Sequence, residues 1–212
     1  MPDQIENIGR AAIDYFTLKH TAREQALPKS RIAIRYCANS IRASHRQEFT
    51  TAAELIAQAG ALLVEMKTAL HDHQDIHFAG FVHDAQKEYA EAATFAALAQ
   101  HQPLPTPQEL AISYAAYLNG LAEAIGELRR YVLDQVRRGN VENCEVFLNY
   151  MDDIYAILIT VDFPDAITSG LRRSTDVARG LLEKTRGDLT TVVVQSQLQR
   201  SLLQLQRELQ QH

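Results

Sequence analysis

Apolar residues recur along this chain at steps of three and four, which is the period of an amphipathic helix. The first such stretch covers about residues 3–26, and a second covers about residues 29–46. Pro28 lies between them, and because a proline lacks a backbone donor we expect the helix to kink or end there. Further helices are expected at about residues 50–70, 76–99, 107–138, 141–160 and 164–187, and a last one after Asp188.

Helix formers dominate the composition and leave little from which to build strands. Leu, Ala, Gln, Glu and Arg are abundant, and Trp is absent. A length of 212 residues allows one large domain or two small ones, and the Pro-rich segment 103–107 is the only candidate linker. We predict an all-α fold, a single-domain bundle of about seven antiparallel helices that covers residues 1–212.

The last helix carries leucines at alternating steps of four and three, at Leu198, Leu202, Leu205 and Leu209. This spacing is typical of a seam along which two helices pack. A seam of this length is compatible with burial against the rest of the same chain and equally with contact to another copy.

The compartment follows from what the sequence lacks. No apolar run reaches the length of a membrane span, and the first six residues, Met-Pro-Asp-Gln-Ile-Glu, lack the basic and then apolar order of a signal peptide. We therefore expect a cytoplasmic protein with no membrane partner, in which Cys37 and Cys144 are buried, reduced thiols. The formal net charge of -5 gives no general attraction for nucleic acid, so any such binding must be local.

One local concentration of positive charge lies between residues 19 and 46. Within it, four arginines are spaced by four, seven and four residues and share one helix face: Arg31, Arg35, Arg42 and Arg46. A basic stripe on a rigid helix can follow a phosphate backbone, because each guanidinium group can donate to two phosphate oxygens at once. A solvated face that pairs with acids elsewhere in the chain is an equally good interpretation.

Two pairs of glutamates lie at helical spacing inside Ala-rich stretches. Glu88 and Glu91 are three residues apart, and Glu123 and Glu127 are four apart, so each pair shares one helix face. Two carboxylates that repel each other are stabilised by a divalent cation, and Mg²⁺ and Mn²⁺ prefer such oxygen ligands. Pairs of this kind are also common on solvated helix faces, which is the simpler interpretation.

A weaker candidate for a metal site is the group of histidines His71, His73 and His77. Histidine suits transition metals, but this group has no obvious fourth ligand and falls at a helix junction. Surface histidines are the simpler interpretation.

Three segments carry a family resemblance. Residues 86–92 read Gln-Lys-Glu-Tyr-Ala-Glu-Ala, and residues 117–128 read Tyr-Leu-Asn-Gly-Leu-Ala-Glu-Ala-Ile-Gly-Glu-Leu. Residues 163–188 begin Phe-Pro-Asp-Ala-Ile-Thr and continue through Gly-Leu-Arg-Arg to Thr-Arg-Gly-Asp. In this order the segments resemble the translin family, in particular its catalytic member, the translin-associated factor X, and the single-chain archaeal relatives.

The resemblance implies a metal-dependent endoribonuclease. It places the four acids of the nuclease subunit at Glu88, Glu91, Glu123 and Glu127, with Glu123 standing where that subunit has Asp. It also implies a shell-like homo-octamer whose inner wall carries the acids. Pro28 departs from the family, which usually runs one long first helix through this region.

The implied reaction is hydrolysis of single-stranded RNA, with single-stranded DNA as a further possible ligand. Mg²⁺ or Mn²⁺ at the four glutamates would activate a water and offset the charge that develops on the phosphate. The arginine stripe would hold the strand, and Arg129 and Arg130, directly after the second acid pair, would help to clamp the phosphate. The alternative is a non-catalytic oligomer that binds single-stranded nucleic acid or acts as a scaffold.

Overall fold

The computed structural model describes residues 2–77 and 79–210. These residues form helices and no strand, which confirms the all-α prediction. In chain order the helices are α1 (Pro2–His45), α2 (Phe49–Ala69), α3 (Gln74–His77), α4 (Gly80–Ala99), α5 (Tyr114–Arg137), α6 (Cys144–Leu158), α7 (Asp165–Thr168) and α8 (Leu171–Gln210).

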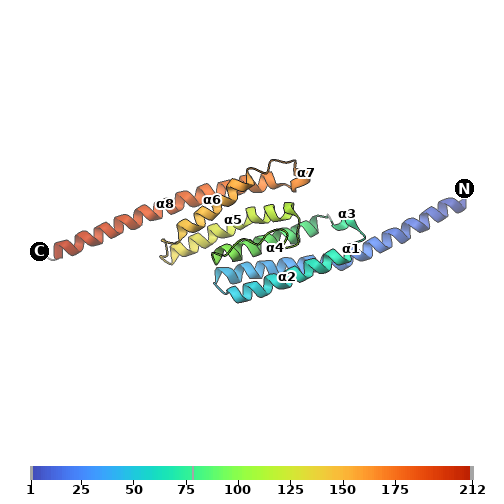
Figure 1. Cartoon of the computed structure of the whole chain (residues 1–212), viewed down its shortest axis with the longest axis horizontal. Coiled ribbons are helices and arrows are strands. Elements are labelled where there is room, and N and C mark those ends of the chain that lie inside the picture. Colours follow the sequence, from blue (N-terminus) through green and yellow to red (C-terminus); the bar gives the residue numbers. More distant parts are fainter. Residues whose placement is uncertain (1, 78, 211–212) are drawn as a thin grey trace.

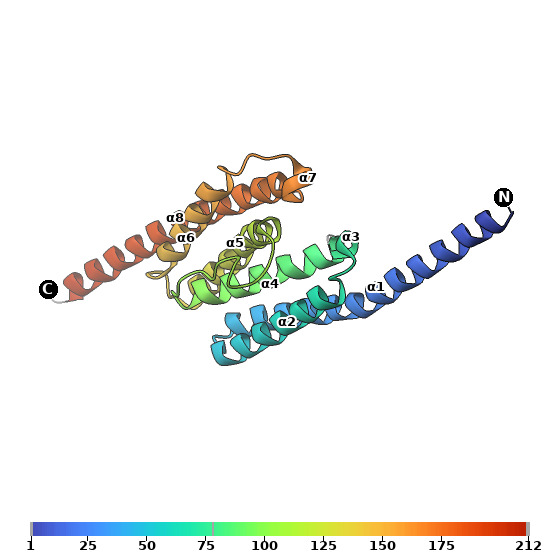
Figure 2. The same ribbon diagram turned by 45° about the vertical axis from the view of Figure 1, so that its right-hand side comes forward.

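The long helices are arranged in three layers (Figure 1). α1 and α2 pack side by side as one outer layer, and α6 and α8 form the other. α4 and α5 lie between them, because α4 contacts α1 and α2 while α5 contacts α6 and α8. Figure 2 shows the same order from a second direction. The two helices that carry the glutamates are therefore the central layer of the bundle.

Small residues allow α4 and α5 to approach each other closely. α4 is rich in buried alanines, as expected of a helix that is covered on several sides. In α5, Gly120 faces the backbone of α4, and a Cβ atom at this position would lie 2.7 Å from Ala90 Cβ and 2.9 Å from the amide nitrogen of Glu91. The glycine is required because any side chain would push the two helices apart.

α1 continues through Pro28, so of the two predicted outcomes, a kink or an end, the end of the helix at this residue is wrong. A proline inside a helix costs about 3 kcal/mol relative to alanine. Here its ring lies on the exposed side, while Ala26 and Ser30 on either side of it are buried and the Ser30 hydroxyl donates to the carbonyl of Leu27 (2.8 Å). Packing of α1 on α2 and α4 therefore outweighs the missing backbone bond.

Two other predicted boundaries also differ from the structure. α8 runs through Gly187 and Asp188 without a break, because Thr185 and Leu189 are both buried on its packed face and hold the helix on the bundle. α5 begins at Tyr114 rather than near Pro107, because the Ser113 hydroxyl caps it by accepting a bond from the amide of Ala116 (3.2 Å).

Both ends of the chain extend beyond the bundle as uncovered helix, in opposite directions (Figure 1). The first turns of α1 expose apolar side chains, among them Ile5, Ile8 and Phe16. The last turns of α8 expose the four seam leucines, from Leu198 to Leu209, by 52–70%. The seam is therefore not buried against its own chain. Among the described residues, no helix combines the length and the apolar character that a membrane span requires.

Candidate metal centre and nucleic-acid interface

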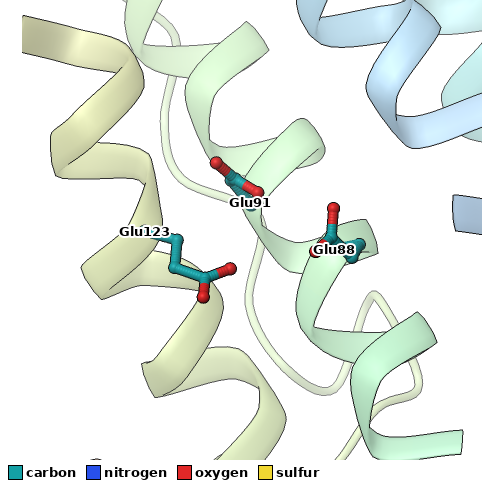
Figure 3. A group of neighbouring side chains, drawn as sticks. All are labelled: Glu88, Glu91 and Glu123. Atoms are coloured by element: carbon teal, nitrogen blue, oxygen red, sulfur yellow. The ribbon is translucent and has the colours of Figure 1, made fainter. Parts of the chain in front are cut away.

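Three of the four predicted acids come together between α4 and α5. Glu88, Glu91 and Glu123 each offer a carboxylate oxygen within 4.8 Å of the others. Figure 3 shows Glu91 and Glu123 on facing sides of the gap between the two helices, with Glu88 one turn away along α4. We refer to these three side chains as the acid group.

Glu91 lies deepest in the acid group and is 9% exposed. None of the described residues donates a hydrogen bond to its carboxylate. Burial, and then the neighbouring Glu88, Glu123 and Glu127 carboxylates, raise the pKa of Glu91 to about 8. The pKa of Glu88 is also raised, first by burial and then by Glu123. At pH 7 the chain alone therefore holds a proton on Glu91.

A lysine partly neutralises the acid group. Lys87 Nζ lies 2.7 Å from Glu123 Oε1 and 3.9 Å from Glu88 Oε1, so its ammonium contacts two of the three carboxylates. The side chain is largely covered by its surroundings. Sequence reasoning did not assign Lys87 a role, although it lies inside the acidic segment of α4.

Glu127, the fourth predicted acid, does not join the acid group. Its Oε2 lies 2.5 Å from Nε2 of His45, a buried residue in the last turn of α1. The His45 ring packs on Phe95, with 4.7 Å between centroids, and its Nδ1 is buried with no partner among the described residues. Helical spacing could have identified His45 as a packed residue, because it follows the buried Ile41 by four positions and so lies on the same face of α1.

The arginine stripe lies on the outer side of α1 and is exposed along its whole length. Arg31 and Arg35 form no ion pair with any of the described residues. Arg42 donates to Asn39 Oδ1 (2.5 Å), and Arg46 binds both carboxylate oxygens of Glu48 at 2.8 Å. The first half of the stripe is therefore the half that is free to bind an external anion.

The two arginines that follow the second acid pair have different surroundings. Arg129 donates to Thr185 Oγ1 (3.0 Å) and to Asp188 Oδ2 (2.7 Å), which fastens α5 to α8. Arg130 is exposed, and its nearest acid is Glu127 at 3.8 Å. Arg130 therefore has the freedom that a phosphate contact requires, whereas Arg129 is held in the packing of the bundle.

A groove of about 680 Å³ lies beside the acid group. It is lined by Lys87, Glu91 and Glu123 on one side and by the first turn of α8, with Arg173 and Ser174, on the other. A second groove of about 800 Å³, next to the loop that precedes α5, shares two lining residues with the first, His83 and Ser169. The two grooves therefore meet at these residues.

The histidine candidate finds no support in the described part of the chain. His71 pairs with the neighbouring Asp72 at 2.9 Å, and both are exposed. Among the side chains that the structure describes, the acid group is the one cluster of metal-ligating residues, and His73 is not part of it. The side chain of His77 lies outside the described residues.

The fold and the site now allow comparison with known proteins. Residues 16–186, which include the four predicted glutamates and the arginine stripe, match the translin family. The chain belongs to the translin family. An uncharacterized protein of Methanocaldococcus jannaschii, MJ0175, is 32% identical over 199 residues, which cover 92% of this chain and 86% of that protein.

Solved structures of translin-like proteins have the same fold. The crystal structure of AfC3PO is 32% identical in sequence and superposes with a TM-score of 0.78, covering 90% of this chain and 97% of the other. The structure of an AfC3PO complex with duplex RNA is similar with a TM-score of 0.77, at 30% identity and the same coverage. Both matches extend over nearly the whole translin-family chain described above.

Proposed function

We propose that this translin-family protein is a metal-dependent endoribonuclease that hydrolyses single-stranded RNA. The observation that carries the proposal is the convergence of Glu88, Glu91 and Glu123 within 4.8 Å on the central layer of the bundle. Glu91 is buried with no hydrogen-bond donor among the described residues, and such a carboxylate is costly unless a cation compensates it.

The acid group fits a small divalent cation. Its donors are all carboxylate oxygens, the hard ligands that Mg²⁺ and Mn²⁺ prefer, and Mg²⁺ sites are usually built from few carboxylates. Side chains from α4 and α5 contribute, so the ligands are held by two packed helices rather than by a loop. Glu88, Glu91 and Glu123 would hold the ion, whereas Glu127 is bound by His45.

The reaction is the addition of water to an RNA phosphodiester. A bond forms between the water oxygen and phosphorus, the bond from phosphorus to one ribose oxygen breaks, and that oxygen takes up a proton. When bound by the acid group, a divalent ion would lower the pKa of the attacking water and offset the negative charge of the phosphate. The carboxylates accept the proton that the attacking water loses. The buried position of Glu91 keeps other water molecules away from the reacting phosphate.

RNA binding rests on the exposed arginines and on a relative. Arg31, Arg35 and Arg130 are predicted phosphate contacts that are exposed and donate no side-chain hydrogen bond among the described residues. Such contacts position a strand without reading its sequence. AfC3PO, a similar protein, has been solved in complex with duplex RNA. We extend RNA binding to this chain, and we include single-stranded DNA as a further ligand because the same arginines would contact its phosphates.

The assembly we propose is a homo-octameric shell. The uncovered apolar faces at the two ends of the chain, on α1 and α8, are surfaces that a second copy could bury. Enclosure would explain how a chain with a net charge of -5 retains RNA, because the arginines could line the interior.

One specific observation favours the alternative, a non-catalytic nucleic-acid-binding shell. The ammonium of Lys87 contacts Glu123 and Glu88, and the ring of His45 bonds to Glu127, so three of the four acids already have partners without a metal. In that case the four glutamates would serve the fold through these contacts, and the protein would bind RNA without cleaving it.

Cleavage of a labelled, unstructured RNA of about 20 nucleotides separates the two functions. We expect cleavage with Mg²⁺ or Mn²⁺ and none with EDTA, and we expect Glu123→Gln to remove most of the activity while leaving helicity unchanged. Glu54→Gln, at an exposed acid on α2, is the matched control and should cleave like the wild type. Binding without cleavage in either metal would favour the alternative, and a duplex of the same sequence tests strand preference.

A further inference from the structure

The wall of the groove opposite the acid group is the first turn of α8. This turn follows two residues with left-handed backbone, Ser169 (φ 53°) and Gly170 (φ 82°), which direct α8 back across α5. Arg173 and Ser174, in the first turn of α8, line the groove together with Glu91 and Glu123. A cationic side chain and the acids therefore share one open space of about 680 Å³.

A buried asparagine fixes this turn relative to the acids. Asn119 is 2% exposed, and its side-chain amide donates to the carbonyl of Thr168 (2.9 Å) while its carbonyl oxygen accepts from the Ser174 hydroxyl (2.8 Å). Asn119 precedes Glu123 by one helical turn, so both project from the same face of α5. The bonds that hold the start of α8 are thus one turn away from an acid-group carboxylate, and Arg173 is held beside it.

Arg173 is free, whereas its neighbour is not. Among the described residues no acid lies within ion-pair distance of Arg173, and its guanidinium is exposed at the groove. Arg172 points elsewhere, pairs with Asp162 at 3.4 Å and does not line the groove. Two adjacent arginines of equal charge therefore differ in the one property that matters, which is access to the space beside the acids.

We propose that Arg173 binds the phosphate that is cleaved, and this inference rests on the proposed nuclease function. A phosphodiester in the groove would present its non-bridging oxygens to a cation in the acid group on one side and to Arg173 on the other. The planar guanidinium donates to two oxygens at once, and such charge-assisted pairs are roughly twice as strong as neutral hydrogen bonds. Arg173 thereby stabilises the negative charge that grows on phosphate during hydrolysis.

This assignment also separates two tasks among the arginines. None of the stripe arginines on α1 lines the groove, so the stripe would hold the strand outside it, and its loss should weaken binding of any RNA. Arg173 acts at the reacting phosphate, so its loss should lower the rate of cleavage more than the affinity.

The experiment compares Arg173→Ala with Arg172→Ala in the full-length protein. In single-turnover cleavage with Mg²⁺ we expect Arg173→Ala to slow the reaction by about 10²-fold, the size of effect seen when one donor to a developing oxyanion is removed. Arg173→Lys should recover part of the rate because it restores the charge but not the paired donors. Arg172→Ala should cleave within about twofold of the wild type, since surface substitutions away from a site have small effects.

A second readout does not depend on activity. We would measure binding of a cleavage-resistant phosphorothioate RNA at several salt concentrations with Mg²⁺ present. Arg173→Ala should lower the slope of log affinity against log salt by about one, because one phosphate contact is lost, and Arg172→Ala should not. In the Glu123→Gln background the effect of Arg173→Ala on binding should shrink, because both groups act on one phosphate.

The outcomes separate this inference from the proposed function. If the wild type cleaves RNA and the two arginine variants behave alike in rate and in salt slope, the assignment of Arg173 is overturned while the nuclease function stands. If the wild type does not cleave in either metal, the nuclease function fails, and with it the role of Arg173 at a reacting phosphate. A salt slope that is still lowered only by Arg173→Ala would then reduce Arg173 to a phosphate contact.

Discussion

Glu91 is a buried acid to which none of the described residues donates a hydrogen bond, so this residue costs stability. Its pKa of about 8 lies above the usual value for glutamate, so the folded state binds its proton more tightly than the unfolded state does. The contribution of Glu91 to stability is therefore most favourable below pH 4.5 and becomes unfavourable as the pH rises through 8. Such a cost is typical of a residue that is kept for function.

We expect Glu91→Gln to stabilise the metal-free protein at pH 8.5 by roughly 1–3 kcal/mol, because it removes a buried charge. The melting temperature should rise by several degrees at pH 8.5, and the gain should disappear near pH 4.5. Thermal unfolding in EDTA at the two pH values measures this, with Glu183→Gln at an exposed position of α8 as the control. A variant that is less stable than the wild type at pH 8.5 would contradict the electrostatic account.

Lys87 competes with a divalent cation for the acid group, since its ammonium contacts Glu88 and Glu123. Replacing it by Gln removes one positive charge next to the carboxylates. We expect Mn²⁺ to bind about three- to tenfold more tightly to Lys87→Gln, the direction that Coulomb attraction at a partly covered site requires. Calorimetric titration with Mn²⁺ checks this, and weaker binding would show that Lys87 supports the site instead.

Spacing identified the faces on which the acids lie, but not their partners. Helical periodicity placed Glu88 and Glu91 on one face of α4, and Glu123 and Glu127 on one face of α5. That Glu123 meets the α4 pair was implied by the family resemblance and not by spacing. The pairing of Glu127 with His45 joins residues 82 positions apart. Contacts of this kind depend on how whole helices are placed, and no local pattern contains that information.

At the scale of helices, the site depends on how closely α4 and α5 approach at Gly120. The glycine faces the backbone of Lys87 to Glu91, so the contact lies directly beside the acids of α4. Gly126, two turns further along α5, has open surroundings, where an added Cβ would meet only Leu181 Cδ1 at 3.7 Å. The same substitution can therefore be compared at a tightly packed position, Gly120, and at an open position, Gly126, of one helix.

We expect Gly120→Ala to destabilise the protein by about 1–3 kcal/mol, the usual effect of overpacking, and to weaken Mn²⁺ binding by moving Glu91 away from Glu123. Gly126→Ala should be neutral or stabilising by about 0.5–1 kcal/mol, because alanine is the better helix former. Chemical denaturation and metal titration of both variants provide the test. Equal stability of the two would mean that the helices shift freely at this contact.

The sequence predicted the type and the approximate position of the long helices, and it failed where tertiary packing overrides a local breaker. Pro28 and Gly187 are residues that end helices when nothing else holds them. In α1 and α8 the buried neighbours Ala26 and Leu189 hold the helix on the bundle, and the breaker is tolerated. Local propensity contains no information about such support.

At the scale of the whole molecule, the uncovered helix ends indicate association. We expect light scattering to report a mass of about eight times that of one chain, because closed symmetric assemblies bury such faces. Leu202→Glu together with Leu205→Glu should reduce this mass, because each places a charge on the seam, whereas Glu208→Gln on the same segment should not. An unchanged mass in the leucine variant would exclude the seam from the interface.

All four glutamates and Lys87 lie on two consecutive helices, between residues 80 and 137. Each copy therefore carries all four predicted acids on its own chain. When wild-type and Glu123→Gln chains are mixed before assembly, the cleavage activity should fall in proportion to the variant fraction. A variant chain should not inhibit the wild-type chains beside it. Measured rates that fall much faster would require shared sites. A subunit without these acids could therefore still take its place in the assembly. Some subunits could then cleave RNA while others only bind it.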